Sequence, residues 1–283
     1  MHSDPPSSDN SHIIDPALEH AVSVRPERVE AQDPSTSSGR ADVSQLKKGR
    51  VERDQRGARD DCDSVPAGLR LARHDRPVPR TVAVAFTGAS GMPYGLRLVE
   101  CLLAAGVQVW LLYSQVAQIV ARQEMGLELP SRPAGVEAAL SERFQAAAGQ
   151  LRVFGREEWF APLASGSNPA DAMVVCPCTM GTLAAIAAGL SQNLIERAAD
   201  VAIKERRQLV LVPRETPFSA LHLENMLKLA RLGVVILPPS PGFYTHPQTV
   251  SGMVDFVVAR ILDQLNVPHA LMSRWGEEPT DEA

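Results

Sequence analysis

The sequence predicts an α/β protein: a three-layer, Rossmann-like or flavodoxin-like parallel sheet with helices on both faces, in a single domain. Two observations predict this fold. From residue 81 onward, short runs rich in Val and Leu alternate with amphipathic segments of helical period. The apolar runs are also continuous rather than alternating apolar and polar, which is typical of strands buried on both faces of a parallel sheet.

Each element follows from the same pattern. The apolar runs predict five strands, at 81–86, 107–113, 172–175, 209–212 and 234–237. The amphipathic segments predict helices at 93–105, 115–125, 181–188, 194–206, 221–231 and 250–265. The pattern is weakest over 130–167, where we expect one more helix and a Gly/Ser loop.

The first 78 residues differ in composition from the rest of the chain. They hold none of its thirteen aromatic residues, and a third of them are charged, with 12 Lys and Arg and 14 Asp and Glu. Such a segment cannot bury enough apolar surface to offset about 1–2 kcal/mol of backbone entropy per ordered residue. We therefore expect residues 1–78 to be a disordered, low-complexity and dispensable extension, and residues 79–283 to be the folded domain.

Composition also excludes several classes of protein. A net charge of −5 and a pI near 5.8 argue against a nucleic-acid binder. No apolar run reaches about 18 residues, and the first thirty residues lack the apolar core of a secretory signal. Four cysteines, Cys62, Cys101, Cys176 and Cys178, are too few for a disulfide scaffold and suit a reducing compartment. We expect a cytoplasmic protein with no membrane or nucleic-acid partner.

A glycine-rich turn follows the first predicted strand and opens a helix at Pro93. Its amides can approach an anion or a polarised ring closely, although Ala89 and Ser90 break the spacing of the dinucleotide fingerprint. The second strand ends in Ser114, where a dinucleotide-binding protein would carry an acid for the ribose. A nicotinamide dinucleotide is therefore disfavoured, a mononucleotide is compatible, and a merely structural turn stays open.

The strand predicted at 172–175 runs into Cys176, Pro177 and Cys178. Two thiols one residue apart have neither zinc-type nor redox-type spacing, so we expect buried cysteines in a loop and no metal. The hydroxyls of Thr179 and Thr182 at the next helix start are better placed to hold a phosphate or a flavin edge.

Cations and a phenol lie near several predicted strand ends. Arg197 and Lys204 share one helix face, Arg214 follows a strand, and Arg260 interrupts an apolar stripe. Tyr244 ends a proline-rich loop. In an acidic domain these residues predict a focused anion site, with phosphate as the natural ligand. A solvated charged face, or an ion pair of Arg260 with a nearby acid, is the structural alternative.

Several motifs, in this order, resemble the UbiX-type flavin prenyltransferases. The resemblance runs from about residue 81 to 275, and the extension has no counterpart in it. The motifs that carry it are Gly88-Ala89-Ser90-Gly91, Tyr94-Gly95, Cys176-Pro177-Cys178, Leu194-Ile195-Glu196-Arg197-Ala198-Ala199-Asp200, Lys204-Glu205-Arg206-Arg207, Pro213-Arg214-Glu215-Thr216-Pro217 and Pro241-Gly242-Phe243-Tyr244.

The resemblance implies a flavoprotein domain that joins a dimethylallyl group from dimethylallyl phosphate to N5 and C6 of reduced FMN. The product, prenylated FMN, would serve a UbiD-type decarboxylase in ubiquinone biosynthesis or aromatic acid decarboxylation. The family needs no metal and forms large homo-oligomers, typically dodecamers, with sites at subunit junctions.

The resemblance also implies roles for individual residues. Ser90 would lie beside flavin N5, Glu124 would form a hydrogen bond near that serine, and the pair would relay a proton. Lys204 and Glu215 would complete the catalytic set. FMN would be held by Gly88, Ala89, Ser90, Ser114, Thr179, Met180, Gly181, Thr182 and Arg214. Dimethylallyl phosphate would be held by Arg197, Lys204, Arg214, Glu215, Tyr244, Arg260 and Trp275.

Two other functions stay open at this point. A flavin-dependent decarboxylase of the phosphopantothenoylcysteine type shares the fold, but its Pro-Ala-Ser-Ala-Asn-Thr loop is absent from this sequence. A non-catalytic FMN-binding subunit would have no need of Lys204 or Arg260.

Overall fold

The computed structural model describes residues 77–273, which lie within one compact unit. The predicted extension, apart from residues 77 and 78, lies outside the described residues. So do Cys62 and the predicted site residue Trp275.

Within residues 77–273, six parallel strands form one sheet in the order β3-β2-β1-β4-β5-β6. The chain first extends the sheet in one direction from β1 and then returns to extend it in the other from β4. Ligands of such sheets bind at the carboxyl ends of the two strands where this order reverses, here β1 and β4. The strands are β1 (Thr81–Phe86), β2 (Gln108–Tyr113), β3 (Leu151–Phe154), β4 (Ala172–Cys178), β5 (Gln208–Pro213) and β6 (Val235–Ile236).

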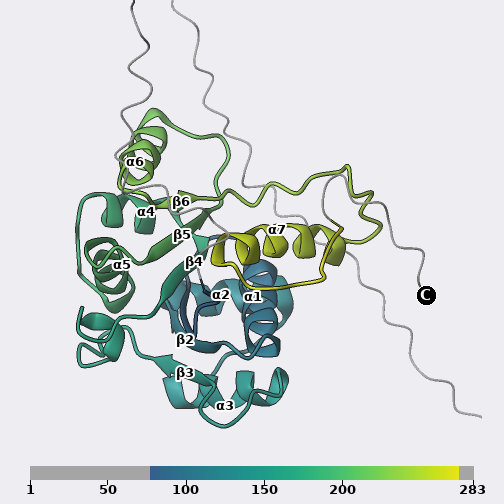
Figure 1. Ribbon diagram of the computed structural model, residues 1–283, viewed down its shortest axis with the longest axis horizontal. Helices are drawn as coiled ribbons and strands as arrows, with labels where there is room; N and C mark the ends of the chain where they lie inside the picture. Colours follow the sequence, from purple (N-terminus) through teal and green to yellow (C-terminus); the bar gives the residue numbers. More distant parts are fainter. Residues whose placement is uncertain (1–76, 274–283) are drawn as a thin grey trace, which may run out of the picture. The chain divides into compact units, whose positions relative to one another are not determined.

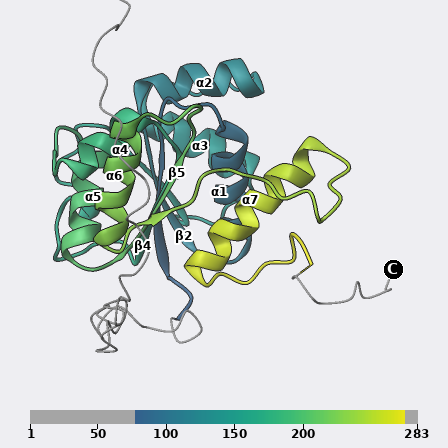
Figure 2. The same cartoon turned by 90° about the horizontal axis from the view of Figure 1, so that it is seen from above.

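Helices cover both faces of the sheet, as Figures 1 and 2 show. One apolar core lies under α1 (Met92–Ala104), α2 (Gln115–Met125), α3 (Pro133–Arg143) and α7 (Val250–Leu265). The other lies under α4 (Met180–Ala187), α5 (Leu194–Lys204), α6 (Ala220–Arg231) and the short turn η5 (Pro162–Ala164). Each helix buries one apolar stripe, while the central strands β1, β2, β4 and β5 are buried on both faces.

The predicted three-layer α/β fold is confirmed, and the five predicted strands are present. The edge strand β3 was not predicted, because the sequence indicated only a helix and a loop over 130–167. β3 is four residues long, and its exposed Arg152 breaks the apolar run. Its pairing with β2, rather than a strong local pattern, makes this segment a strand.

Cys176 and Cys178 lie in a strand, so the expectation that they lie in a loop is wrong, although both are buried as expected. β4 continues through a register shift after Val175 and pairs again with β5 at Cys178. Burial raises the pKa of the Cys178 thiol to about 12 and also raises the pKa of Cys176. Both thiols therefore stay protonated at neutral pH, which makes them packing groups rather than nucleophiles.

Candidate active site

The turn after β1 is glycine-rich because other elements approach it closely. A Cβ on Gly88 would lie 2.4 Å from Cγ1 of Val116 on α2. Gly91 has a φ of 124°, a conformation that residues with a side chain rarely adopt. A Cβ on Gly95 would lie 2.5 Å from the carbonyl oxygen of Cys176. The turn and the first residues of α1 thus pack directly against α2 and β4.

Glu124 caps the N-terminus of α1 from outside that helix. The N-cap residue Gly91 has no side chain to accept a hydrogen bond. The carboxylate of Glu124 instead accepts from the backbone N–H of Gly91 at 3.0 Å and of Met92 at 2.8 Å. Negative charge is favourable at a helix N-terminus. This contact places the carboxylate beside the exposed Ser90.

Hydroxyl groups join the ends of β1 and β4. The buried Thr87 donates from Oγ1 to the carbonyl of Pro177 and accepts from the backbone N–H of Thr179, both at 2.8 Å. Thr179 accepts from the N–H of Thr182 at 3.1 Å and donates to its hydroxyl at 2.9 Å. This network holds the start of α4 against the end of β1.

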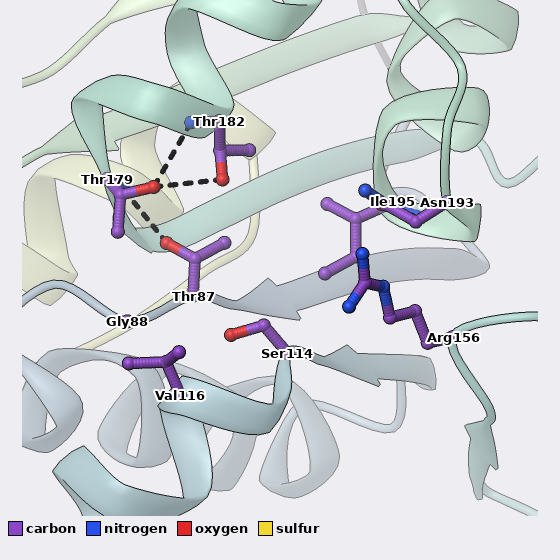
Figure 3. Close-up of a pocket in the computed structure, with 9 residues that line it drawn as sticks. All are labelled: Thr87, Gly88, Ser114, Val116, Arg156, Thr179, Thr182, Asn193 and Ile195. Atoms are coloured by element: carbon purple, nitrogen blue, oxygen red, sulfur yellow. Dashed lines mark hydrogen bonds between the residues drawn. The ribbon is translucent and has the colours of Figure 1, made fainter.

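A pocket of about 260 Å³ opens at these strand ends. Figure 3 shows three threonine hydroxyls gathered on one side of it and Arg156 on the other. Three of its residues, Ser114, Thr179 and Asn193, are the N-caps of α2, α4 and α5. The pocket is lined by Thr87, Gly88, Ser114, Val116, Arg156, Thr179, Thr182, Asn193 and Ile195.

The structure brings four of the residues predicted to bind FMN into this pocket: Gly88, Ser114, Thr179 and Thr182. The remaining predicted FMN residues lie around it. Ala89 and Ser90 continue the turn after β1, and Met180 and Gly181 form the first turn of α4. Arg214 lies at the same edge of the sheet, where its N–H donates to the carbonyl at the end of β4 at 3.3 Å.

Both cations predicted on α5 form ion pairs with acids close by in the sequence. Arg197 donates from Nε to the carbonyl of Ala164 at 3.0 Å and pairs through Nη1 with Asp200 at 2.8 Å. Lys204 is the last residue of α5 and pairs with the neighbouring Glu205. Because ten residues of helix rise about 15 Å, Lys204 lies at the opposite end of α5 from the pocket.

Two residues predicted from the C-terminal part of the chain gather on α7. The ring of Tyr244 packs edge-on against Phe256, with ring centroids 5.6 Å apart. Arg260, one turn further along α7, pairs with Asp263 at 2.7 Å, and its side chain is 44% exposed rather than enclosed in an apolar stripe. The C-terminal end of α7 lies beside the start of β5: the side chain of Gln208, the first residue of that strand, donates a hydrogen bond to the carbonyl of Gln264.

One chain does not bring all these charges together at the carboxyl edge of the sheet. Arg214 and Glu215 directly follow β5 and lie at the carboxyl edge of the sheet. Lys204 and Arg260 lie near the amino edge, because each is near the C-terminal end of a helix that returns antiparallel to the strands. Within one chain, two of the seven residues predicted to bind the phosphate, Lys204 and Arg260, therefore lie away from the pocket.

Comparison with known proteins identifies the family. The model of the Flavoprotein family matches residues 71–262. The chain is 58% identical over 200 residues to the flavin prenyltransferase UbiX of Pseudomonas aeruginosa, a match that covers 71% of this chain and 96% of that protein. The chain belongs to the UbiX flavin prenyltransferase family. The flavin prenyltransferase UbiX of Halalkalibacterium halodurans is 47% identical over 195 residues, covering 69% of this chain and 93% of that protein.

Solved structures of UbiX proteins have the same fold. AnUbiX (PadA1), in complex with FMN and dimethylallyl pyrophosphate, is 38% identical with a TM-score of 0.63, covering 71% of this chain and all of that chain. A dodecameric FMN-dependent UbiX-like decarboxylase from Escherichia coli is 42% identical with a TM-score of 0.61, covering 70% of this chain and all of that one. The resemblance stated from the sequence motifs is confirmed.

Sequence reasoning missed several residues of the UbiX pocket: Thr87, Val116, Arg156, Asn193 and Ile195. Asn193 had a usable signal, since asparagine before an amphipathic segment is a common N-cap. Its Oδ1 accepts from the backbone N–H groups of Ile195 and Glu196 at 3.0 and 3.1 Å. Arg156 follows the unpredicted strand β3, so no sequence pattern placed it at a strand end.

Among the helices within residues 77–273, none has the length and the apolar composition that a membrane span requires. No group of three or more His, Cys, Asp or Glu side chains in the same range is arranged to hold a metal ion.

Proposed function

We propose that this protein is a flavin prenyltransferase that joins a dimethylallyl group from dimethylallyl phosphate to N5 and C6 of reduced FMN. The observation that carries the proposal is its 58% identity to the flavin prenyltransferase UbiX of Pseudomonas aeruginosa across 96% of that protein. The pocket supports it, because it lies at the strand ends where nucleotides bind in this type of sheet.

The residues around the pocket fit FMN. Helix N-termini and hydroxyls suit a phosphate and the hydroxyl groups of a ribityl chain. Any side chain on Gly88 would fill the space against Val116, so the bare backbone keeps the pocket open. In our proposal FMN is held by Gly88, Ala89, Ser90, Ser114, Thr179, Met180, Gly181, Thr182 and Arg214.

When bound, reduced FMN supplies the nucleophilic positions that take the prenyl group. The chain must accept the proton that N5 loses. Ser90 is exposed beside the carboxylate of Glu124, which two backbone amides hold in place. The Ser90 hydroxyl can take this proton and pass it to a Glu124 oxygen.

The chain must also stabilise the phosphate that leaves the prenyl group. Arg197, Lys204, Arg214, Tyr244 and Arg260 supply cations and donors for this purpose, with Glu215 orienting them. One chain does not assemble them, and the side chains of Lys204 and Arg260 are 45% and 44% exposed. We infer that neighbouring copies of the chain complete each site in a homo-oligomer. The UbiX-like decarboxylase from Escherichia coli is such an assembly, a dodecamer.

The proposal extends to the destination of the product. Prenylated FMN would be delivered to a UbiD-type decarboxylase, in ubiquinone biosynthesis or in aromatic acid decarboxylation, within the cytoplasm. The AnUbiX structure is a complex with dimethylallyl pyrophosphate, so both compounds have to be tested as the donor for this chain.

The decisive experiment follows the flavin itself. The full chain is incubated without oxygen with reduced FMN and either dimethylallyl phosphate or dimethylallyl pyrophosphate, and the flavin is analysed by mass spectrometry. The expected product is heavier than FMN by one prenyl unit. Recovery of unchanged FMN with both donors would overturn the proposal and leave a non-catalytic FMN-binding role. Release of CO2 from phosphopantothenoylcysteine would favour the decarboxylase instead.

Complementation tests whether copies share a site. Replacing Lys204 by Ala should lower the prenylation rate by about 10² to 10³, because it removes about 2–4 kcal/mol of charge stabilisation. Ser90→Ala should also inactivate the protein. If a site takes Ser90 from one chain and Lys204 from another, hybrids of the two variants regain activity, because some junctions then hold both intact residues. Hybrids as inactive as the single variants would show that one chain holds the whole site.

A further inference from the structure

Arg156 is the one charged side chain among the residues that line the pocket. It lies two residues after β3, and its carbonyl accepts the backbone N–H of Leu194 at 2.9 Å, which ties this loop to the start of α5. Figure 3 shows its guanidinium on the side of the pocket lined by Asn193 and Ile195, opposite the three threonine hydroxyls. Within residues 77–273 this guanidinium forms no hydrogen bond or ion pair, so it is available to a ligand.

The residues that line the pocket with Arg156 include no acid, and three of them are helix N-caps. Ser114, Thr179 and Asn193 cap three helices at this pocket, and each helix N-terminus carries about half a positive charge. Two nearby carboxylates are engaged elsewhere. Glu196 accepts from the N–H of Gln192 and from the side chain of Asn193 at 2.8 and 2.7 Å. Glu158, on the loop of Arg156 itself, accepts the N–H of Gly155 at 3.0 Å.

The hydrogen bonds inside the pocket show which groups remain free to donate. The Ser114 hydroxyl accepts the N–H of Ala117 at 3.1 Å, so its own proton can point to a ligand. Both ends of the Asn193 amide are already bonded within the first turn of α5. A ligand at this side of the pocket would therefore meet the Ser114 hydroxyl, the guanidinium of Arg156 and the first-turn amides of the helices.

We propose that Arg156 binds the 5′-phosphate of FMN and makes this chain prefer FMN to riboflavin. An unpaired guanidinium, a free hydroxyl proton and three helix N-termini are complementary to a phosphate dianion and offer nothing comparable to the neutral end of riboflavin. This inference rests on the proposed function, because it takes FMN as the ligand of the pocket. It makes Arg156 a binding residue and assigns it no part in the prenyl transfer.

The test compares the affinities of the full chain for FMN and riboflavin, measured by flavin fluorescence. Arg156→Gln removes the charge and keeps a side chain of similar length, whereas Arg156→Lys keeps the charge and loses the planar fork. Arg152→Gln is the matched control, because Arg152 is exposed on β3 and stacks on Phe154, with its guanidinium carbon 4.9 Å from the ring centroid. It removes the same charge four residues away without touching the pocket.

We expect Arg156→Gln to weaken FMN binding about tenfold or more, to change riboflavin binding less than about twofold, and to weaken the dependence of FMN affinity on salt. Arg156→Lys should fall between this variant and the parent, and Arg152→Gln should match the parent. An unchanged ratio of FMN to riboflavin affinity in Arg156→Gln overturns the inference, as does a parent chain that binds both flavins equally. Failure of the proposed function is separate, since it would appear as a parent that leaves FMN unprenylated.

Discussion

The contact between Gly88 and Val116 allows a sharp test of how the pocket is built. In Gly88→Ala the new Cβ would lie 2.4 Å from Cγ1 and 2.7 Å from Cβ of Val116, whereas ordinary contacts begin near 3.4 Å. The turn and α2 must separate by about 1 Å. Rotating the valine side chain cannot relieve the contact, because its Cβ is itself too close and valine in a helix keeps one χ1 rotamer.

We expect Gly88→Ala to lower the free energy of unfolding by about 1–3 kcal/mol, the usual cost of overpacking. It should also weaken FMN binding, because both residues line the pocket. Val116 is 52% exposed, so Val116→Ala alone should cost little. Combined with Gly88→Ala it removes the 2.4 Å contact and leaves the 2.7 Å contact, so part of the loss should return. Val116→Gly removes both contacts. In the Val116→Gly background, Gly88→Ala should therefore lower the free energy of unfolding less than it does in the Val116→Ala background.

The assay is urea unfolding of the single and double variants at one fixed protein concentration, with FMN affinity measured on the same samples. A fixed concentration is needed because association of copies adds to the measured stability. The quantity of interest is the coupling energy of each pair, which we expect to be about 1–2 kcal/mol and larger with glycine at position 116. Strictly additive effects of the two substitutions would refute this account of the pocket wall.

Three further predictions follow from the same structure. Glu124→Ala should lower the free energy of unfolding by about 1 kcal/mol, because α1 loses its cap, and should abolish prenylation. Glu128→Ala breaks only a surface ion pair with Arg122 and should cost less than about 0.5 kcal/mol. Equal effects of the two substitutions in urea unfolding and activity assays would contradict this prediction. Burial raises the pKa of Cys178 to about 12 from an ordinary 9.0, so the contribution of this thiol to stability is complete below pH 9 and is lost as the pH rises toward 12. At pH 8 the thiol should resist alkylation in the native protein and react in the unfolded protein. Rapid alkylation of the native protein, measured by mass spectrometry, would count against this prediction. Deleting residues 1–76 should leave the prenylation rate within about threefold of the full chain, and a larger loss in a folded deletion variant would assign that segment a role.

Local patterns in the sequence determined most of the fold. Continuous apolar runs and helical periodicity predicted five strands and six of the helices, because buried strands and amphipathic helices must carry those patterns to form a core. The same local chemistry pointed to Gly88, Ser114, Thr179 and Thr182, which lie at strand ends and helix starts. A parallel sheet brings such positions together whatever the intervening sequence.

Tertiary structure decided three things that local sequence patterns did not. β3 is a strand because it pairs with β2, and it carries Arg156 to the pocket. Glu124 reaches the turn after β1 because α2 packs beside it. The sequence places Lys204 on the same helix face as Arg197 and Arg260 on the apolar stripe of its helix. Both residues nevertheless lie at the edge of the sheet opposite the pocket. Residue spacing along a helix determines which side of the helix a residue is on, whereas the path of the chain determines which end of the sheet that residue reaches.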